Sequence, residues 1–501
     1  MPSGIASRPC SRPSSASPPR RCWPTPRSPR STASSIRSRC SRCSSCSRPN
    51  TKSSFPPCSP AMCCRSMSPN SLPSSSSGCR PMAESPRHPG TARRRVVITG
   101  AGVVSALGNS PPEFHRSLQS GQAGIVCQPD TELLRAVGAA TFDASAHFSR
   151  LELLSLDRGT QFALVASEQA MHESGVTLAP DANAGVYWGT GGGGFETIEA
   201  SYGRFYGAAP GGSGGSGAAM TVPAAMVHAP AAQVSIRHGV RGECLTYSTA
   251  CSSASVAIGE AFLRIALGLR DVAIAGGSEC ALLPGVLKGW LAMRVLCDDP
   301  REGIPSGCRP FDRDRQGFAL GEGAAAFVLE SYEHAMARGA EVLAELVGYG
   351  ASNDASHITR PDGAGQIRAM THALACADIA PSDVSYINAH GTGTPFGDAV
   401  ECASIAAVFG ESAQRIPISS TKAAHGHLLG ASGAIEMLAC LYALRMQCVP
   451  PTLNWVAPDP ATAGWDFVPN VGRPANLRHV MSNSFAFGGN NAVLIARRWP
   501  G

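Results

Sequence analysis

Residues 95–102 read RVVITGAG, a β-branched run that leads into the glycine turn Gly100-Ala101-Gly102. Val and Ile favour strands, so we expect the folded part of the chain to begin here with a short buried strand. A similar run, AELVGYG at residues 344–350, opens the later part of the chain. The recurrence indicates two related halves, residues 93–343 and residues 344–501.

Helical and strand-like patterns alternate after each of these runs. Apolar periodicity predicts helices over residues 162–174 and 255–269, and short buried strands over residues 272–275 and 386–388. Alternation of this kind is typical of layered folds in which helices cover sheets. The predicted fold class is therefore α/β.

Residues 1–92 differ in composition from the rest of the chain. They contain 17 prolines, nine cysteines and 14 Lys plus Arg, but a single acidic residue, Glu84. Proline breaks helices and few apolar residues are available for burial, so we expect a disordered leader. We favour a stretch translated from a misplaced start; the alternative is a plastid or mitochondrial transit peptide, although the prolines oppose the amphipathic helix of a mitochondrial presequence.

The formal net charge of +6 comes from this leader, because the remaining residues hold 28 basic against 35 acidic side chains, a balance of −7. Without a basic folded face, we do not expect nucleic-acid binding. The ten later cysteines are scattered and form no C-x-x-C pair, which fits a reduced compartment, and we expect the cytoplasm. No apolar run reaches the roughly 18 residues that a membrane span requires.

A glycine cluster, GTGGGG at residues 189–194, follows a strand-like run and precedes a flexible segment at residues 207–217. The cluster lacks the G-K-[ST] ending of a phosphate-binding loop. We therefore interpret it as close backbone packing near a site, and not as a nucleotide cradle.

The segment TYSTACSSA at residues 246–254 places Cys251 between a strand-like run and the start of a helix. Unpaired N–H groups and the dipole at a helix N-terminus stabilise a thiolate, so we expect a lowered thiol pKa and a nucleophilic Cys251. A buried structural cysteine would show the same local pattern, and this segment alone leaves both interpretations open.

A second segment, NAHGTGTPFGD at residues 388–398, carries His390 from a strand end into a tight polar loop that also contains Thr392 and Thr394. Histidines placed in this way often face a pocket, although a capping or solvated histidine is the alternative.

A third segment, STKAAHGHLLG at residues 420–430, contains Lys422, His425 and His427 and opens a long apolar helix over residues 434–445. No acidic or cysteine ligand completes a metal-binding spacing nearby, so we expect no metal here.

A fourth segment, NSFAFGGNN at residues 483–491, has two glycines directly after Phe487. Glycines let the backbone turn sharply and present N–H groups to an oxyanion. A tight turn packed by two phenylalanines is the alternative.

In this order, the four segments resemble the beta-ketoacyl-[acyl-carrier-protein] synthases, most closely the elongating type I/II group of the thiolase-like superfamily. The resemblance covers about residues 94–498. It implies two repeated halves, each with a mixed five-stranded sheet, in a five-layered α/β/α/β/α arrangement. It also implies a homodimer, no cofactor, and acyl carrier protein as the partner that brings both substrates.

The resemblance assigns a role to each matching residue. Cys251 would carry the acyl chain, His390 and His427 would be the catalytic histidines, and Lys422 the motif lysine with Glu401 as its acidic partner. The reaction implied is decarboxylative Claisen condensation of the acyl chain with malonyl-acyl carrier protein, which gives 3-oxoacyl-acyl carrier protein and carbon dioxide.

Further roles come from the same resemblance. The backbone N–H groups of Cys251 and Phe487 would form the oxyanion hole, and Phe487 would be a mobile gate. Thr392 and Thr394 would support the site. Gly192 stands where a bulkier residue gates the acyl pocket in some elongating enzymes, so we expect an ungated pocket.

Two departures from the family pattern bear on the pathway. His425 occupies a position where threonine is commoner, and Asn490 replaces the threonine of a Gly-Gly-Thr-Asn motif. We expect fatty acid biosynthesis, with a specialised polyketide, aryl-polyene or nodulation-type lipid pathway as the alternative. A non-enzymatic scaffold is disfavoured because all three catalytic side chains are present.

Overall fold

The computed structural model describes residues 93–126, 136–206, 219–297 and 307–500. Two predictions fall outside these ranges, namely the disordered leader and the flexible segment at residues 207–217. The N-terminal half supplies five strands to the main sheet: β1 (Val96–Val104), β3 (Ala184–Gly189), β4 (Cys244–Tyr247), β5 (Val272–Glu279) and β7 (Gly323–Ser331). The C-terminal half supplies five more: β8 (Ala344–Asn353), β9 (Val384–Asn388), β10 (Ile418–Ser419), β13 (His479–Phe485) and β14 (Asn490–Arg497).

Both halves arrange their five strands in the same way. The order across the sheet is β1-β7-β5-β3-β4 in one half and β8-β14-β13-β9-β10 in the other, so the first strand of each half lies beside its fifth. Corresponding pairs also run in the same sense, antiparallel around β7 and β14 and parallel around β3 and β9. The halves meet where β1 pairs antiparallel with β8. The predicted repeat of two mixed five-stranded sheets is confirmed.

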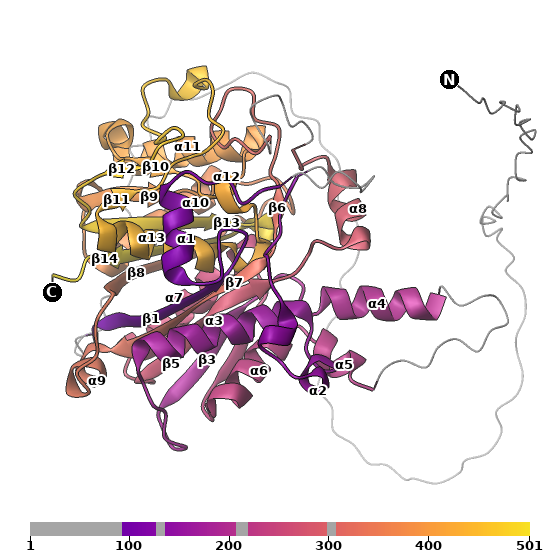
Figure 1. Cartoon of the computed structure of the whole chain (residues 1–501). Coiled ribbons are helices and arrows are strands. Elements are labelled where there is room, and N and C mark those ends of the chain that lie inside the picture. Colours follow the sequence, from indigo (N-terminus) through magenta and orange to yellow (C-terminus); the bar gives the residue numbers. More distant parts are fainter. Residues whose placement is uncertain (1–92, 127–135, 207–218, 298–306, 501) are drawn as a thin grey trace, which may run out of the picture. The chain divides into compact units, whose positions relative to one another are not determined.

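Helices complete the layers (Figure 1). On one side, α3 (Arg158–Ser174) packs against β1 and β7, and on the other, α10 (Gly363–Ala377) packs against β8 and β14. Between the sheets, α7 (Ser253–Ala266) contacts β3 and β5 as well as β8 and β14, while α13 (Ser432–Met446) contacts β7 and β13. The layers follow one another as helix, sheet, helix, sheet and helix, which is the predicted five-layered arrangement.

Shorter elements connect and flank these layers. The remaining α-helices are α1 (Pro111–Gln119), α2 (Arg150–Leu153), α4 (Phe195–Tyr206), α5 (Thr221–Ala225), α6 (Ala229–His238), α8 (Pro284–Met293), α9 (Tyr332–Ala337), α11 (Pro395–Phe409) and α12 (Lys422–His425). The remaining strands are β2 (Val137–Gly138), β6 (Leu320–Gly321), β11 (Cys448–Val449) and β12 (Arg473–Pro474).

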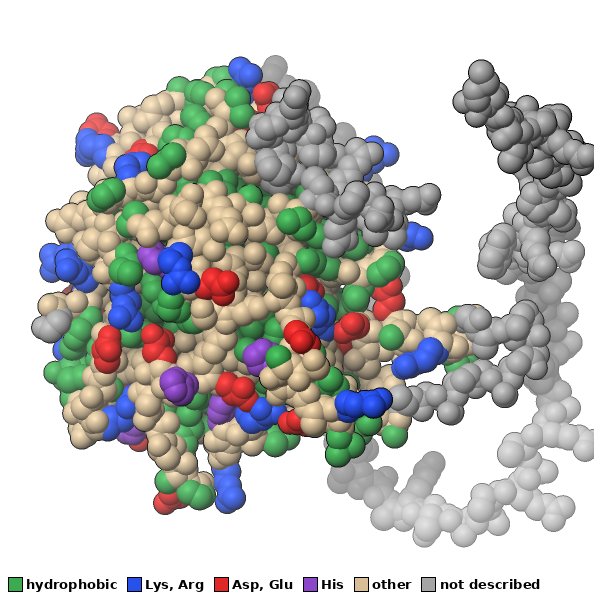
Figure 2. Space-filling view, in the orientation of Figure 1, with side chains coloured by type: hydrophobic (Ala, Val, Ile, Leu, Met, Phe, Trp, Pro, Cys, Tyr) green, Lys and Arg blue, Asp and Glu red, His purple; other side chains and the backbone are tan. Residues whose placement is uncertain are grey.

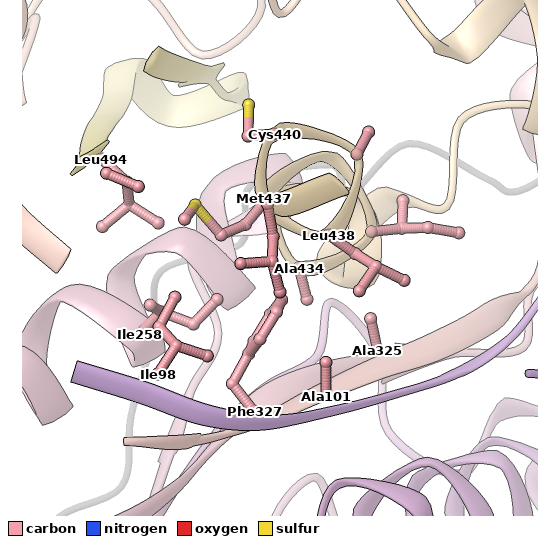
Figure 3. Packing of buried hydrophobic residues seen from close by; sticks show 14 of the residues in the cluster. Ile98, Ala101, Ile258, Ala325, Phe327, Ala434, Met437, Leu438, Cys440 and Leu494 are labelled. Atoms are coloured by element: carbon pink, nitrogen blue, oxygen red, sulfur yellow. The ribbon is translucent and has the colours of Figure 1, made fainter. Parts of the chain in front are cut away.

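The middle layer carries the main hydrophobic core (Figure 3). Ala434, Met437 and Leu438 of α13 lie over Ala101 of β1 and Phe327 of β7, and all five side chains are buried. A helix buried on all sides is apolar on all sides, which explains the composition of α13.

The apolar composition of α13 bears on one expectation, that no stretch of the chain is long enough to span a membrane. The helical stretch Leu429–Met446 is long and apolar enough to cross a bilayer by length and composition, whereas we expected no such stretch. However, 89% of it is buried inside the fold, so it belongs to the middle layer described above.

The glycines that we predicted to form a turn lie inside β1. A Cβ on Gly102 would stand only 1.9 Å from the carbonyl oxygen of Ala166 on α3, and one on Gly100 would meet α3 equally closely. Gly348 and Gly350 of β8 meet α10 in the same way. These glycines therefore permit close helix packing and do not break the strand.

Several predicted elements differ in extent from the observed ones, and the helix expected over residues 255–269 already ends at Ala266. The helix expected over residues 162–174 begins at Arg158, because the Asp157 side chain caps it by accepting the Gly159 N–H at 3.0 Å. The strand expected over residues 272–275 continues to Glu279. That extension brings Glu279 to the edge of the site.

One face of the molecule carries side chains of both signs of charge. Figure 2 shows Lys and Arg side chains interspersed with Asp and Glu over one face of the molecule. This face therefore offers no continuous basic track along which a phosphate backbone could lie.

Candidate active site

Cys251 lies in the turn between β4 and α7, where the sequence predicted it. It belongs to the 3-10 turn Ala250–Ser252, directly before the first residue of α7. Ala250 has a φ of +53°, a left-handed conformation that is uncommon for a residue with a side chain. The sharp turn holds Cys251 against the N-terminal end of α7, where Cys251 is only 7% exposed.

Two histidines from the other half meet this cysteine. His427, just after α12, places its Nε2 3.1 Å from Cys251 Sγ. His390, just after β9, has its ring centroid 5.6 Å from that of His427 at an interplanar angle of 83°. The fold therefore brings together three residues that are far apart in the sequence, and the site forms where the two halves meet.

Hydrogen bonds fix which nitrogen of each histidine carries a proton. The Leu429 backbone N–H donates to His427 Nδ1 at 3.3 Å, so the neutral ring holds its proton on Nε2. The Lys422 ammonium lies 3.4 Å from His390 Nδ1, which gives His390 the same tautomer. Both imidazoles therefore present an Nε2–H donor on the Cys251 side.

The acidic partner of Lys422 is Glu436, and the predicted pairing with Glu401 is wrong. Lys422 Nζ forms an ion pair with Glu436 Oε1 and donates to the His390 carbonyl oxygen at 2.6 Å. Both side chains of the pair are fully buried. Glu436 faces Lys422 from α13, a helix whose other residues have the composition of a buried core helix.

Glu401 holds the backbone of the His390 loop instead. Its two carboxylate oxygens accept the N–H groups of His390 at 2.8 Å and Gly391 at 2.7 Å. Asn483 adds a hydrogen bond to the same carboxylate at 3.2 Å. Glu401 therefore orients the loop that carries His390.

Burial changes the acid–base properties of the three central side chains. It raises the pKa of Cys251 to about 12, which contradicts the lowered pKa that we expected from the helix N-terminus. Desolvation of the thiolate outweighs the nearby Lys422 charge and the backbone hydrogen bond from Phe487. Burial, aided by the Lys422 ammonium, holds the pKa of His390 and of His427 well below the ordinary value. The resting site therefore contains a thiol and two neutral imidazoles.

A cavity of about 250 Å³ opens onto these side chains. Its walls combine aromatic and aliphatic side chains with a few polar groups, which suits a chain bound as a thioester. The lining includes Cys251, Trp290, Phe318, Ile358, Arg360, His390, Thr392, Thr394, Phe396, Glu401, His427 and Phe487.

Phe487 and the two predicted threonines lie in the cavity wall. The Phe487 ring stacks on Trp290 with 6.1 Å between ring centroids. The backbone N–H of Phe487 donates a hydrogen bond to the Cys251 sulfur. Thr392 and Thr394 share a hydrogen bond of 2.9 Å between their hydroxyls, and Thr394 caps α11 by accepting the Gly397 N–H. Both threonines thus shape the loop that follows His390.

The open pocket that we expected at Gly192 is not present. The Phe195 ring occupies the place of the missing side chain, since a Cβ on Gly192 would stand 1.8 Å from two ring carbons. Phe195 packs in the apolar cluster that also contains Trp290 and Phe318. Phe195, three positions further along the chain, therefore fills the space beside Gly192, behind the residues that line the cavity.

His425 and Asn490 lie outside the cavity lining. His425 is fully buried, with Nδ1 2.7 Å from the Gly426 carbonyl oxygen and Nε2 3.0 Å from Thr421 Oγ1. Burial lowers the pKa of His425 to about 3. Asn490 accepts a hydrogen bond from Asn353 at 3.3 Å. His425 therefore supports the backbone before His427 and does not face substrate.

Cys251, His390 and His427 could also be read as metal ligands, because their ligand atoms all lie within 4.8 Å of one another. Lys422, 3.4 Å from His390 Nδ1, places a positive charge directly behind one of them. That charge opposes a second cation at short range, and both histidines would have to give up their Nε2 protons. The geometry favours proton donors over a metal site.

Family models match both halves of the chain. The model described as "Beta-ketoacyl synthase, N-terminal domain" matches residues 93–335, and "Beta-ketoacyl synthase, C-terminal domain" matches residues 343–456. The chain belongs to the beta-ketoacyl synthase family. The synthase is accordingly an acyl-transferring, decarboxylative condensing enzyme with the thiolase-like fold that its segments predicted.

The relatives of this synthase include nodulation proteins and 3-oxoacyl-[acyl-carrier-protein] synthases. It is 42% identical over 414 residues to Nodulation protein E of Rhizobium sp. (strain N33), covering 81% of this chain and 99% of that protein. It is 38% identical over 415 residues to 3-oxoacyl-[acyl-carrier-protein] synthase 2 of Staphylococcus aureus (strain COL), with the same coverage. A solved complex, AntDE:AntF, matches with a TM-score of 0.74 and 31% identity over 81% of this chain and 100% of that one; it contains a type II PKS acyl-carrier protein with its ketosynthase.

Proposed function

We propose that the synthase joins an acyl chain on Cys251 to a malonyl unit on acyl carrier protein, with His390 and His427 as the catalytic histidines. The observation that carries the proposal is the convergence of two Nε2–H donors on the Cys251 side of one cavity. Family membership supplies the reaction class, and these residues supply the groups that it needs.

In the first half-reaction, Cys251 Sγ attacks the thioester carbonyl of an acyl carrier. The tetrahedral oxyanion is held by backbone N–H groups of Cys251 and Phe487. The carrier sulfur leaves with the proton that the thiol gives up, and the acyl chain remains on Cys251. Because burial raises the pKa of Cys251 to about 12, attack and proton transfer are coupled, without a standing thiolate.

In the second half-reaction, malonyl-acyl carrier protein enters the same cavity. His390 and His427 donate hydrogen bonds from Nε2 to its thioester carbonyl, so the carboxylate leaves as carbon dioxide and an enolate forms. The enolate carbon then attacks the Cys251 acyl carbonyl. The Cys251 sulfur leaves, regains a proton, and 3-oxoacyl-acyl carrier protein is released.

Two pathways remain as candidates for this chemistry. Fatty acid biosynthesis is supported by the similarity to the Staphylococcus synthase, and a specialised lipid or polyketide pathway by the higher identity to Nodulation protein E. The test is to supply malonyl-acyl carrier protein with acyl carriers that bear saturated, unsaturated or polyketide chains. Efficient extension of saturated chains supports fatty acid biosynthesis, and a strong preference for another chain supports the specialised pathway.

The Phe195 ring gives a prediction about chain length. Phe195→Ala removes a ring that packs in one cluster with Trp290 and Phe318 of the cavity wall, so the cavity should enlarge and longer acyl chains should load onto Cys251 faster. Each additional buried methylene contributes about 0.8 kcal/mol, or roughly fourfold in rate preference. The measurement is the initial rate of Cys251 acylation from carriers with short, medium and long chains. Leu151→Ala, which changes an exposed apolar residue of α2, is the control. An unchanged profile of chain lengths for Phe195→Ala would refute the prediction.

We also propose a homodimer, as the resemblance implied. Strand β4 forms one edge of the ten-stranded sheet, and α4 beside this half exposes Tyr202, Phe205 and Tyr206 by 61%, 57% and 77%. An exposed edge strand and an apolar patch are typical of a surface covered by a partner.

The predicted outcome is a dimer by light scattering that Tyr202→Glu combined with Phe205→Glu converts to a monomer. Val471→Glu, which changes another exposed apolar residue, should leave the dimer intact. A wild-type monomer would contradict the proposal. We expect the synthase to work in the cytoplasm, because the scattered cysteines of the later part of the chain, with no C-x-x-C pair, fit a reduced compartment.

A further inference from the structure

Glu279 is a buried carboxylate that the reaction above does not use. It ends β5, is 1% exposed, and accepts hydrogen bonds through both of its oxygens. Oε2 accepts the N–H groups of Gly191 at 2.6 Å and Gly430 at 3.0 Å, and Oε1 accepts the N–H of Gly192 at 3.2 Å. The Thr190 hydroxyl lies 3.3 Å from Oε1. Burial raises the pKa of Glu279 to about 7, and these backbone and hydroxyl donors oppose that shift by favouring the ionised carboxylate.

The two segments that Glu279 joins belong to opposite sides of the site. Gly191 lies in the loop after β3, and its carbonyl oxygen accepts a hydrogen bond from Ser248 at 3.2 Å, in the run that leads to Cys251. Gly430 lies in the turn after His427. The neighbouring residue in that turn, Leu429, donates its N–H to His427 Nδ1. The carboxylate therefore connects the backbone beside Cys251 to the turn that sets the His427 tautomer.

The two segments also touch directly, which leaves no room for another group between them. A Cβ on Gly430 would stand 2.1 Å from the Gly191 nitrogen and 2.6 Å from Glu279 Oε2. Both segments present N–H donors to the same point. Glu279 Oε2 accepts one N–H from each segment, while Oε1 accepts donors from the Gly191 segment alone.

The repeat of the fold offers a comparison. In the C-terminal half, Glu401 accepts the N–H groups of His390 and Gly391, in the loop that follows β9. Strands β3 and β9 are the second strands of their halves and hold equivalent places in the sheet. Equivalent loops are thus each held by a buried carboxylate, although Glu279 comes from a strand and Glu401 from a helix.

We propose that Glu279 is a positioning residue of the condensation step, which fixes the His427 ring against Cys251 by tying the loop after β3 to the turn after His427. The inference rests on the proposed function. Its consequence is specific, since loss of the tie misplaces the Nε2–H donor of His427, whereas attack by Cys251 on an acyl carrier does not require that donor.

The test is Glu279→Gln, which keeps the shape but turns one acceptor into an N–H group that faces N–H donors. Condensation with malonyl-acyl carrier protein should fall roughly 10- to 100-fold, as expected for a misplaced catalytic group. Acylation of Cys251, followed by intact-protein mass, should stay within about threefold of the wild type, because Cys251 itself is unchanged. Glu279→Asp keeps both acceptors and should recover part of the condensation rate.

Two further variants separate positioning from stability. Glu330→Gln alters another fully buried carboxylate of the same half, which pairs with Arg338 away from the cavity. It should lower the melting temperature without changing the ratio of condensation to acylation. Gly430→Ala places a Cβ against the Gly191 nitrogen and so pushes the two segments apart. It should reproduce the altered ratio of condensation to acylation, and it serves as the test if Glu279→Gln fails to fold.

An unchanged ratio in folded Glu279→Gln, or in Gly430→Ala where Glu279→Gln is unfolded, would overturn the proposal and leave Glu279 with a structural role alone. A wild-type synthase that is acylated but forms no condensation product would instead refute the proposed function. The two failures are therefore distinguishable.

Discussion

Cys251→Ala is expected to abolish the acyl-enzyme and, with it, all condensation. No other described side chain is placed to take over, because the two donors of His390 and His427 converge on the Cys251 sulfur alone. The change removes one buried sulfur, so the variant should still fold with at most a modest loss of stability. Intact-protein mass after incubation with acyl carrier protein measures the effect directly.

The matched control is Cys448→Ala, which removes a buried thiol from β11, outside the cavity lining. It should acquire the acyl group at the wild-type rate. A Cys251→Ala protein that still gains the mass of an acyl chain on another side chain would show that the nucleophile has been misassigned.

His427→Ala is expected to separate the two half-reactions. The His427 Nε2–H is one of two donors to the malonyl thioester carbonyl, and loss of one donor of this type costs roughly 100- to 1,000-fold in rate. Attack of Cys251 on an acyl carrier uses backbone donors instead, so acylation should persist. The measurements are acyl-enzyme formation by mass and release of carbon dioxide from malonyl-acyl carrier protein.

A suitable control is His115→Ala, which alters a buried histidine on α1 that stacks on Tyr442 away from the cavity. Both half-reactions should proceed normally in that variant. Carbon dioxide release by His427→Ala at the wild-type rate would contradict the role given to this residue.

Much of the site could be predicted because its residues stand at the ends of recognisable elements. Cys251 precedes a helix that begins with small residues, and His390 follows a short buried strand, so local pattern and residue type place both in loops that face a pocket. The order of four such segments then indicated the family. The repeat was also visible, since the strands that open the two halves have similar sequences.

Other features depended on contacts between distant segments. Glu436 was hidden because it lies in a helix that otherwise reads as core, although a single acid among the apolar residues of α13 is a detectable signal for a buried partner. The ring of Phe195 and the contacts of Glu279 follow from packing that has no sequence period. The raised pKa of Cys251 reflects burial, which a helix-terminus argument leaves out.

The glycines of β1 illustrate the same limit. Gly100 and Gly102 carry the composition of a turn, but their role is to let α3 approach the strand, and only the packed structure shows the helix. In the C-terminal half, Gly348 and Gly350 let α10 approach β8 in the same way. Sequence pattern therefore located the strand correctly and assigned the wrong reason to its glycines.

The central claim is that one cysteine carries the chain that is then extended by loss of carbon dioxide. The most direct test is to follow Cys251 by peptide mass spectrometry, first with acyl carrier protein and then after addition of malonyl-acyl carrier protein. We predict that the acyl mass appears on the peptide containing Cys251 and disappears as 3-oxoacyl-acyl carrier protein forms. An acyl group that never appears there, or that stays in place while product accumulates, would contradict the account.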